Sequence, residues 1–550
     1  MADPSDPSMT TATEMNLRGR KVPGLLLLLA IASLLLFPLL GKQGLTDPDE
    51  SAYVESVREM MDRGDWLVPR LYGQPILDKP ILVYWVIGAS FQLFGKSELS
   101  ARLPTAMAAL GLLFAVWRLG KLTHKRDGAG FLSALVLLSS LEFVLMGRAA
   151  VTDMFLTLFC TLGILCYAET LWAGGSRLLP LVGAACIGLA VLTKGPLGLL
   201  IPGMVLGACF VASLGRHRIG TIRPLASAAV FAAVTFPWYV AIAVLSPDLV
   251  KEFIVGGNLG RFLSAEHRPQ PPLYYAVVLL IGFLPWSAFL PGALSRVLAA
   301  GYRGDRRHGR LLLPALWLLV LLVFFTLAAS KLPSYILPAL PAAAVLAAEP
   351  LTTWLEPAPP GGRLRGTGAM ILLVILAGGM VLFAVERQSF GSIPASFKAA
   401  LLPVCFAGLL GTLFALSSLI LQRPRLAFLL LLGGNVILIF SLLLFGFPIL
   451  EPWKSSRQAA EAVRPMIQPA DRVLLYRDNR AGFAYYLGRV PEQPRRETEL
   501  VAAALDPTRF FCLMERDRFE KLRARRPDLP LYLLTRSGQS VVVTNRSPTE

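Results

Sequence analysis

Charged residues are scarce in this sequence of 550 residues. Lysine, arginine, aspartate and glutamate make up 16% of it, and 55% of the residues are hydrophobic. Ordinary soluble domains carry about 25% charged residues. Apolar runs of about 18 or more residues recur along the chain, which is the pattern of membrane-spanning helices. A soluble globular protein is thereby excluded, and we expect a bundle of helices whose backbone hydrogen bonds are closed internally.

The sequence also lacks paired cysteines and a phosphate loop. Five of its six cysteines lie in apolar segments and Cys512 stands alone in the polar C-terminal part, so neither a CxxC metal site nor a disulfide is expected there. No glycine-rich phosphate loop opens a helix. We therefore expect no nucleotide cofactor.

Basic residues exceed acidic ones, and the formal net charge is +17. Nucleic-acid binding is one explanation, but cytoplasmic lysines and arginines are the simpler explanation in a polytopic membrane protein. No nucleic-acid partner is therefore expected. Near the N-terminus, Arg18, Arg20 and Lys21 precede the apolar run 23–40, as in a signal peptide. No small-x-small cleavage site follows, so this run is predicted to be the first membrane helix.

Apolar windows predict about 13 membrane-spanning helices. They are placed near 23–41, 101–120, 130–147, 152–173, 178–194, 197–214, 224–246, 273–295, 311–329, 333–349, 367–386, 398–421 and 426–446. Segments 50–63 and 81–94 are too polar or too short to span and are predicted to lie along the membrane surface.

Arginine-rich connections fall in alternate loops, which the positive-inside rule places in the cytoplasm together with residues 1–22. The opposite loops include 42–100 and 247–272. They hold the motifs DPDE, DKP, RAAVTD, TKGP, GRFLSAEHR and SKLPSY. The charge bias and the motifs therefore agree on an extracytoplasmic functional site.

The C-terminal part, 450–550, has a different composition from the membrane domain, 23–449. Strand-like runs at 472–476, 510–514 and 531–544 alternate with helical segments, which predicts a small α/β domain. An odd number of spans places it outside the cytoplasm. Its arginines either form a basic face toward an anionic lipid or simply keep the domain soluble. The predicted fold class is a polytopic α-helical membrane protein with a small C-terminal α/β domain.

Three carboxylates are candidate catalytic groups. Asp49 and Glu50 lie in the acidic stretch 46–80, which is otherwise explained as a solvated connector. Asp153 opens an apolar run, where it could simply stabilise a helix start. An ionisable residue beside a span is, however, a functional candidate that needs a partner. We therefore predict that Asp49 and Asp153 converge on one cavity.

Basic residues on the same predicted side are candidates for a phosphate site. Most stand beside a proline or glycine that ends a helix. A single lysine there would only reach for lipid headgroups, whereas several on one face favour phosphate binding. Tyr335 is either a hydroxyl donor to this site or an interfacial aromatic anchor. The candidate substrate-binding residues are Lys79, Arg148, Lys194, Arg261, Arg268, Lys331 and Tyr335.

Histidine is rare, and one of the four histidines lies among the polar motifs. His267 stands beside Glu266 and Arg268 in the loop 247–272. A surface histidine is the ordinary explanation. Imidazole and carboxylate are also metal ligands, so His267 and Asp78 are candidate ligands for a divalent metal such as zinc.

Taken together, the motifs over roughly 20–350 resemble a known family. The stretch DPDESAYVESVREMMDRGDWLVPRLYGQPILDKPILVYW, then LTKGPLGLLIP, GRFLSAEHRPQPPLYY with GFLPW, and SKLPSYILPALP follow one another in the order and spacing of bacterial 4-amino-4-deoxy-L-arabinose transferases. Those enzymes are protein-mannosyltransferase-like glycosyltransferases of the GT-C type. They take the sugar from an undecaprenyl-phosphate carrier and place it on lipid A phosphate at the outer face of the bacterial inner membrane.

The resemblance implies roles for particular residues. Asp49 and Asp153 match the essential aspartates of the family, Lys79 its carrier-phosphate lysine, and Asp78 and His267 positions proposed to hold a metal. Asp78 replaces a frequent glutamate but keeps a carboxylate. Asn258-Leu-Gly-Arg-Phe replaces a frequent histidine before the Arg-Phe pair, which leaves the identity of the sugar open.

The acceptor decides what the aspartates would do. A phosphate monoester is already largely ionised at neutral pH, so for lipid A we expect Asp49 and Asp153 to orient the sugar, including its ammonium group, rather than to remove a proton. A protein or glycan hydroxyl would need a general base. A lipid or solute transporter is the non-enzyme alternative, although transporters usually place their charged residues near the membrane midplane.

Overall fold

The computed structural model describes residues 14–17, 20–125, 127–174, 176–212, 220–253, 260, 270–302, 309–355, 379, 411–418, 421 and 423–547. The chain divides into two compact units. Unit 1 comprises 1–38, 78–82 and 105–442, and unit 2 comprises 39–77, 83–104 and 443–550. Each is considered by itself.

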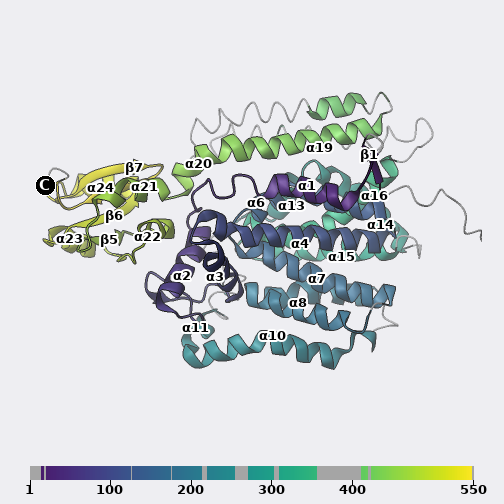
Figure 1. Ribbon diagram of the computed structural model, residues 1–550, viewed down its shortest axis with the longest axis horizontal. Helices are drawn as coiled ribbons and strands as arrows, with labels where there is room; N and C mark the ends of the chain where they lie inside the picture. Colours follow the sequence, from purple (N-terminus) through teal and green to yellow (C-terminus); the bar gives the residue numbers. More distant parts are fainter. Residues whose placement is uncertain are drawn as a thin grey trace, which may run out of the picture. The chain divides into compact units, whose positions relative to one another are not determined.

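Helices make up nearly all of the described part of unit 1 (Figure 1). They are α1 Gly24–Leu36, α4 Glu98–His124 (which begins in unit 2), α5 Asp127–Leu138, α6 Leu141–Gly147, α7 Thr152–Ala173, α8 Leu179–Lys194, α9 Leu197–Val211, α10 Pro224–Leu245, α11 Pro247–Lys251, α13 Tyr274–Gly282, α14 Leu290–Tyr302, α15 Leu312–Leu327, α16 Leu340–Leu355 and α19 Pro424–Ser441. Short 3-10 helices cover Trp286–Phe289, Gly309–Leu311 and Pro333–Ala339, and β1 Glu14–Leu17 pairs with β2 Arg20–Pro23.

Several of the described helices have the length and apolar composition of a membrane span. Among the described residues, six helical segments are long and apolar enough to cross a membrane, or eight if two bent pairs each count as one span. The predicted spans at 23–41, 178–194 and 197–214 correspond to the shorter helices α1, α8 and α9. The predicted spans 367–386 and 398–421 lie mostly outside the described residues. The count of about 13 spans therefore stays a prediction.

Two predicted spans are sharply bent. The helix expected over 130–147 bends by 71° between α5 and α6, and the one over 273–295 bends by 114° after α13. At the first bend, Ser139 and Ser140 donate side-chain hydrogen bonds to the carbonyls of Leu135 and Leu137, each at 2.7 Å. Such bonds compete with the backbone ladder. At the second bend, Pro285 has no N–H to continue the helix.

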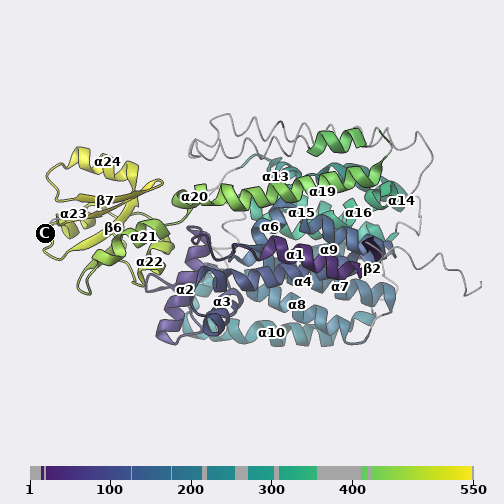
Figure 2. The same ribbon diagram turned by 45° about the horizontal axis from the view of Figure 1, so that its top comes forward.

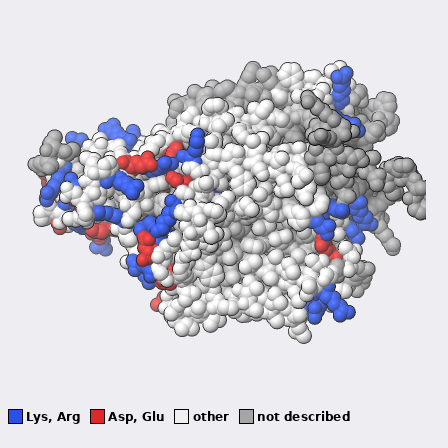
Figure 3. All heavy atoms as spheres, in the orientation of Figure 1, with Lys and Arg blue, Asp and Glu red and all other residues white. Residues whose placement is uncertain are grey.

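The face of unit 1 seen in Figure 3 is largely apolar. Figure 3 shows a broad surface over its helices without lysine, arginine, aspartate or glutamate. On α10, Leu225, Val240 and Val244 are among the exposed side chains. A water-soluble protein would rarely expose so large an apolar surface, so this exterior fits contact with lipid.

Connections predicted to be cytoplasmic lie together at one end of unit 1. The Arg310 guanidinium donates to two carbonyl oxygens, each at 3.1 Å. One belongs to Leu122, near the end of α4, and the other to Trp172, near the end of α7. Near the same helix ends, Arg118 pairs with Glu169. The motif-bearing ends of α7 and α8 are the opposite ends of those helices, which agrees with the predicted alternation of loops.

Unit 2 contains the first loop and the C-terminal part. Its first elements are α2 Asp49–Arg63, the short pair β3 Arg70–Leu71 and β4 Gln74–Pro75, and α3 Leu82–Phe94. The later ones are α20 Phe447–Lys454, α21 Arg457–Val463, α22 Ala481–Leu487, α23 Glu497–Leu505, α24 Arg516–Arg525, and the strands β5 Arg472–Leu475, β6 Phe510–Glu515, β7 Tyr532–Ser537 and β8 Ser540–Thr544. The strand order is β5-β6-β8-β7, with β5 parallel to β6 and the other pairs antiparallel.

The α/β composition of the C-terminal part agrees with the prediction. Alternate residues of β6 face opposite sides of the sheet: Cys512 packs with α23 and α24, whereas Phe511 packs with α21 and α22. Figure 2 shows α24 and α22 on opposite sides of the strands. The predicted single run 531–544 is two strands joined at Gly538, whose φ of 55° suits a hairpin turn.

A close approach of α8 and α9 explains one glycine of the TKGPLG motif. A Cβ atom on Gly198 would lie 2.2 Å from the backbone carbon of Ala190, so the two helices can meet only if position 198 has no side chain. We expect Gly198→Ala to destabilise the protein by about 1–3 kcal/mol. The measurement is the thermal midpoint of the purified protein in detergent.

The matched control is Gly203→Ala on the same helix, where an added Cβ meets nothing within 4 Å. Because alanine is the better helix former, this variant should be unchanged or slightly more stable. Equal midpoints for the two variants would contradict the close approach of α8 and α9.

Candidate active site

Asp153 and Lys194 form a buried ion pair within unit 1. The Lys194 Nζ lies 2.7 Å from Oδ1 of Asp153, and the two side chains are 8% and 11% exposed. Asp153 belongs to the first turn of α7 and Lys194 is the last residue of α8. The Gly195–Pro196 turn ends α8 at this lysine, with Gly195 at a φ of 66°. The Asp153 carboxylate therefore forms an ion pair in addition to standing in the first turn of a helix.

The SKLPSY segment carries two more candidates, and it brings one of them, Tyr335, to this pair. The Lys194 ammonium lies over the Tyr335 ring, 4.6 Å from its centre. Lys331 is also buried, and its Nζ donates to the carbonyl of Ala328 at 2.6 Å. No carboxylate pairs with Lys331 among the described residues. The Tyr275 hydroxyl accepts a hydrogen bond from the Leu332 N–H at 3.3 Å, which ties the segment to α13.

Asp153, Lys194 and Tyr335, with Lys331 on the same segment as Tyr335, form what we call the α7–α8 cluster. Its members come from three motifs that lie far apart in the sequence, RAAVTD, TKGP and SKLPSY. The cluster holds two buried ammonium groups and one carboxylate among these residues, so it retains positive charge. Charge-assisted hydrogen bonds from such groups suit a phosphate.

Arg148 and Lys79 have other contacts in unit 1. Arg148 donates to the carbonyls of Leu35, Leu36 and Pro38 at 3.0, 2.9 and 2.6 Å. It thereby supplies donors to carbonyls at the end of α1 that have no partner within the helix. The Lys79 Nζ lies 2.7 Å from Oδ2 of the neighbouring Asp78. Neither contact tests the substrate-binding or metal roles predicted for these residues, which stay predictions.

The predicted metal site is not tested by the described residues. Among them, no group of three or more His, Cys, Asp and Glu side chains is arranged to hold a metal ion. His267, Arg261 and Arg268 lie outside the described residues. Their predicted roles, and the pairing of His267 with Asp78, stay predictions.

In unit 2, Glu50 is buried against Arg102. Both Glu50 oxygens accept from the guanidinium, at 2.9 and 2.8 Å, and one also accepts from the Thr46 N–H. Arg102 donates further bonds to the carbonyls of Leu40, Gln43 and Gly44, so all five of its N–H donors are used. Asp49, the first residue of α2, is exposed beside this network.

Asp47 lies in the acidic stretch 46–80 and is not one of the three candidate catalytic carboxylates. Its carboxylate accepts from the N–H and hydroxyl of Ser456 at 2.9 and 2.6 Å and from the Gly482 N–H at 2.9 Å. Ser51 donates a further hydrogen bond. Burial raises the pKa of the Asp47 carboxyl above its ordinary range, against the opposite effect of these hydrogen bonds. Asp47 thus joins the first loop to the C-terminal part.

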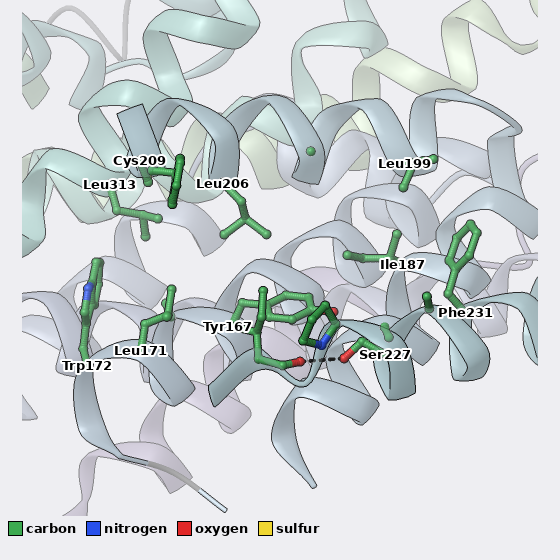
Figure 4. A pocket seen from close by; sticks show the side chains of 17 residues that line it. Tyr167, Leu171, Trp172, Ile187, Leu199, Leu206, Cys209, Ser227, Phe231 and Leu313 are labelled. Atoms are coloured by element: carbon green, nitrogen blue, oxygen red, sulfur yellow. Dashed lines mark hydrogen bonds between the residues drawn. The ribbon is translucent and has the colours of Figure 1, made fainter. Parts of the chain in front are cut away.

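Each unit also contains a cavity. In unit 1, apolar side chains of α7 to α10 line a cavity of about 400 Å³, shown in Figure 4. Ser227 is one of its few polar residues, and its hydroxyl donates to the Ile222 carbonyl at 2.8 Å. In unit 2, a polar cavity of about 530 Å³ is lined by residues that include Arg58, Lys96 and Arg464. Neither cavity is lined by the α7–α8 cluster.

The chain is similar to known membrane glycosyltransferases. The model of the dolichyl-phosphate-mannose-protein mannosyltransferase family matches residues 78–240. In solved structures, the chain shares its fold with ArnT from Cupriavidus metallidurans bound to undecaprenyl phosphate, with a TM-score of 0.79 and 22% identity over 95% of this chain and 98% of that one. The apo state of that protein aligns with a TM-score of 0.77.

Particular relatives carry a more specific name. The chain is 34% identical over 321 residues to the undecaprenyl phosphate-alpha-4-amino-4-deoxy-L-arabinose arabinosyl transferase of Yersinia enterocolitica, and 30% identical over 342 residues to the second such enzyme of Proteus mirabilis. These alignments cover 57% and 61% of this chain and 56% and 60% of the relatives. The chain thus covers less than two thirds of the length of either relative. The similarity to aminoarabinose transferases predicted from the motifs is confirmed.

The Glu50–Arg102 network yields a stability prediction. Arg102→Met would leave a buried carboxylate and three carbonyls without their donor, and removing one partner of a buried pair costs about 3–5 kcal/mol. We therefore expect a clearly lower thermal midpoint of the purified protein.

Lys96→Met is the control, because Lys96 pairs with Asp62 and both side chains are well exposed, at 39% and 47%. Exposed pairs contribute about 0–1 kcal/mol, so this midpoint should barely move. Similar decreases of the thermal midpoint in the two variants would mean that the buried Glu50–Arg102 network contributes little to the stability of unit 2.

Proposed function

We propose that this chain is a membrane glycosyltransferase that moves 4-amino-4-deoxy-L-arabinose from undecaprenyl phosphate to a lipid A phosphate. The observation that carries the proposal is the α7–α8 cluster, a buried group of cations in a chain similar to named aminoarabinose transferases. Lipid carriers reach such a site from the membrane, which agrees with the apolar exterior of unit 1.

The reaction breaks the bond between the anomeric carbon of the sugar and the carrier phosphate. The bonding electrons stay on the phosphate, so negative charge grows there while the sugar becomes oxocarbenium-like. Lys331 and Lys194 are the groups that stabilise this charge, and Tyr335 adds a hydroxyl donor. A buried site strengthens such contacts because little water screens them.

The acceptor phosphate then forms the new bond to the anomeric carbon. Its second pKa is about 6, so it is largely ionised at neutral pH and needs no base. Asp153 holds Lys194 in place, and Asp49 orients the sugar. The described contacts of Glu50 support a positioning role in the Arg102 network, in place of direct participation in the chemistry.

The remaining assignments follow from the family resemblance. Lys79, Arg261 and Arg268 bind carrier phosphate, Arg148 supports the same face, and Asp78 with His267 holds a divalent metal such as zinc. The protein lies in the bacterial inner membrane with about 13 spans over 23–449. The loops 42–100 and 247–272, the active site and the α/β domain 450–550 face the periplasm.

The first functional test removes a cation. In a transfer assay with undecaprenyl-phosphate-linked aminoarabinose and lipid A, we expect Lys331→Met to lower kcat about a hundredfold, as for the loss of one preorganised charge-stabilising group. Lys121→Met, near the opposite end of the bundle in the last turn of α4, is the control and should keep full activity.

Absence of any sugar transfer by the unaltered protein would refute the enzyme and favour a transporter. Transfer to a protein or glycan hydroxyl, but not to lipid A, would identify the related glycosyltransferase with another acceptor. Equal activity of the Lys331 and Lys121 variants would remove Lys331 from the phosphate site.

A second test concerns the aspartate of the first loop. If Asp49 orients the sugar, Asp49→Asn should lose activity to the same degree at pH 7 and pH 9, because no proton has to be removed from an ionised phosphate. The measurement is kcat across this pH range, with the unaltered protein as reference. Recovery of the variant at alkaline pH or with a more nucleophilic acceptor would instead make Asp49 the general base.

A further inference from the structure

Glu142 is a buried carboxylate whose charge is left unmatched by the described residues. It lies in α6, is 7% exposed, and neither of its oxygens has a hydrogen-bond partner among the described residues. Burying an unpaired carboxylate is costly in an apolar bundle, so such a residue is a candidate for function. One acidic residue barely alters the apolar window 130–147, so the sequence pattern gives no signal for Glu142.

The surroundings of Glu142 are the elements that carry the α7–α8 cluster. Helix α6 contacts α7, which bears Asp153, and the 3-10 helix Pro333–Ala339, which bears Tyr335. It also contacts α13, which ends at Gly282. The Asp153 carboxylate is close enough to act electrostatically on Glu142. Glu142 therefore belongs to the same neighbourhood as the cluster.

Gly282 makes room for the Glu142 carboxylate. A Cβ atom at position 282 would lie 2.6 Å from Oε2 and 3.0 Å from Cβ of Glu142. Any side chain there would force the glutamate to move. The glycine of the GFLPW motif thus fixes where this carboxylate stands, and its substitution displaces the carboxylate without changing its charge.

The two acidic groups of this neighbourhood differ in their partners. Asp153 already has a basic partner, Lys194, at 2.7 Å. Glu142 has no basic partner among the described residues. A cation supplied by a ligand would therefore interact more strongly with Glu142 than with Asp153.

We propose that Glu142 binds the ammonium group of the amino sugar and so selects donors that carry a charged amine. The inference rests on the proposed function, because that function supplies a donor with a phosphate at one end and an ammonium at the other. The cations Lys194 and Lys331 receive the phosphate, and Glu142 receives the amine. Charge complementarity at both ends would fix the direction in which the sugar lies.

The test compares two donors in the purified full-length protein. One is undecaprenyl-phosphate-linked 4-amino-4-deoxy-L-arabinose, and the other is the same lipid carrying L-arabinose, whose hydroxyl replaces the amine. The unaltered protein should prefer the amino donor in kcat/KM by about tenfold to a hundredfold, as expected for a hydrogen-bonded charge pair. Glu142→Gln should reduce that preference to within about threefold, mainly through a higher KM for the amino donor.

Three further variants separate recognition from folding. Glu142→Asp keeps the charge and should retain part of the preference. Gly282→Ala should weaken the preference, whereas Gly111→Ala should not, because an added Cβ there meets only an ordinary contact at 3.4 Å. Thermal midpoints measured in parallel identify any variant that has merely lost its fold.

The outcomes distinguish this inference from the proposed function. Failure of the unaltered protein to transfer either sugar would refute the function. Transfer of the amino sugar without preference over L-arabinose, or an unchanged preference in a folded Glu142→Gln variant, would leave the function standing and overturn the role of Glu142. In that case, the residue is a protonated structural glutamate.

Discussion

The ion pair between Asp153 and Lys194 is the contact on which the functional part of unit 1 depends. A charged group inside an apolar bundle needs a partner, and here each partner comes from a different helix end. The pair holds the start of α7 against the end of α8, and the Tyr335 ring lies over its ammonium. Three separate motifs are thereby held in one place.

Close backbone packing makes this pair possible. Because position 198 has no side chain, α9 can turn back against α8 directly after the Gly195–Pro196 break. Lys194 therefore ends its helix facing α7 while the chain reverses. The same physical device recurs at Gly282, where a missing side chain leaves room for Glu142. Glycines at helix ends, and not only charged side chains, define the polar neighbourhood.

The sequence predicted the helices better than the contacts between them. The bounds of α7 were predicted to the residue, because Thr152 and Gly174 bracket one continuous apolar run. The break at Ser139 was not predicted, since apolar windows do not register a change in helix direction. Long-range pairs such as Glu50–Arg102 were not predicted either, because their partners are 52 residues apart in sequence.

The candidate site was predicted in part. TKGP and SKLPSY were identified because prolines and glycines beside lysines mark helix ends, and the structure places Lys194 and Tyr335 together. Glu142 was missed inside an apolar run, and Asp47, which lies two residues before the candidate Asp49, bonds Ser456 and Gly482. What a carboxylate does depends on its neighbours in space, which composition does not reveal.

The Asp47 contacts have a consequence for biosynthesis. Asp47 and Ser456 are 409 residues apart, so the first loop leaves the ribosome long before the serine that satisfies its carboxylate is made. At about 5–20 residues per second, the delay is roughly 20–80 seconds. During that time most of the membrane helices are inserted while this aspartate lacks its Ser456 and Gly482 donors. Completion of unit 2 is therefore one of the last events in the assembly of the chain.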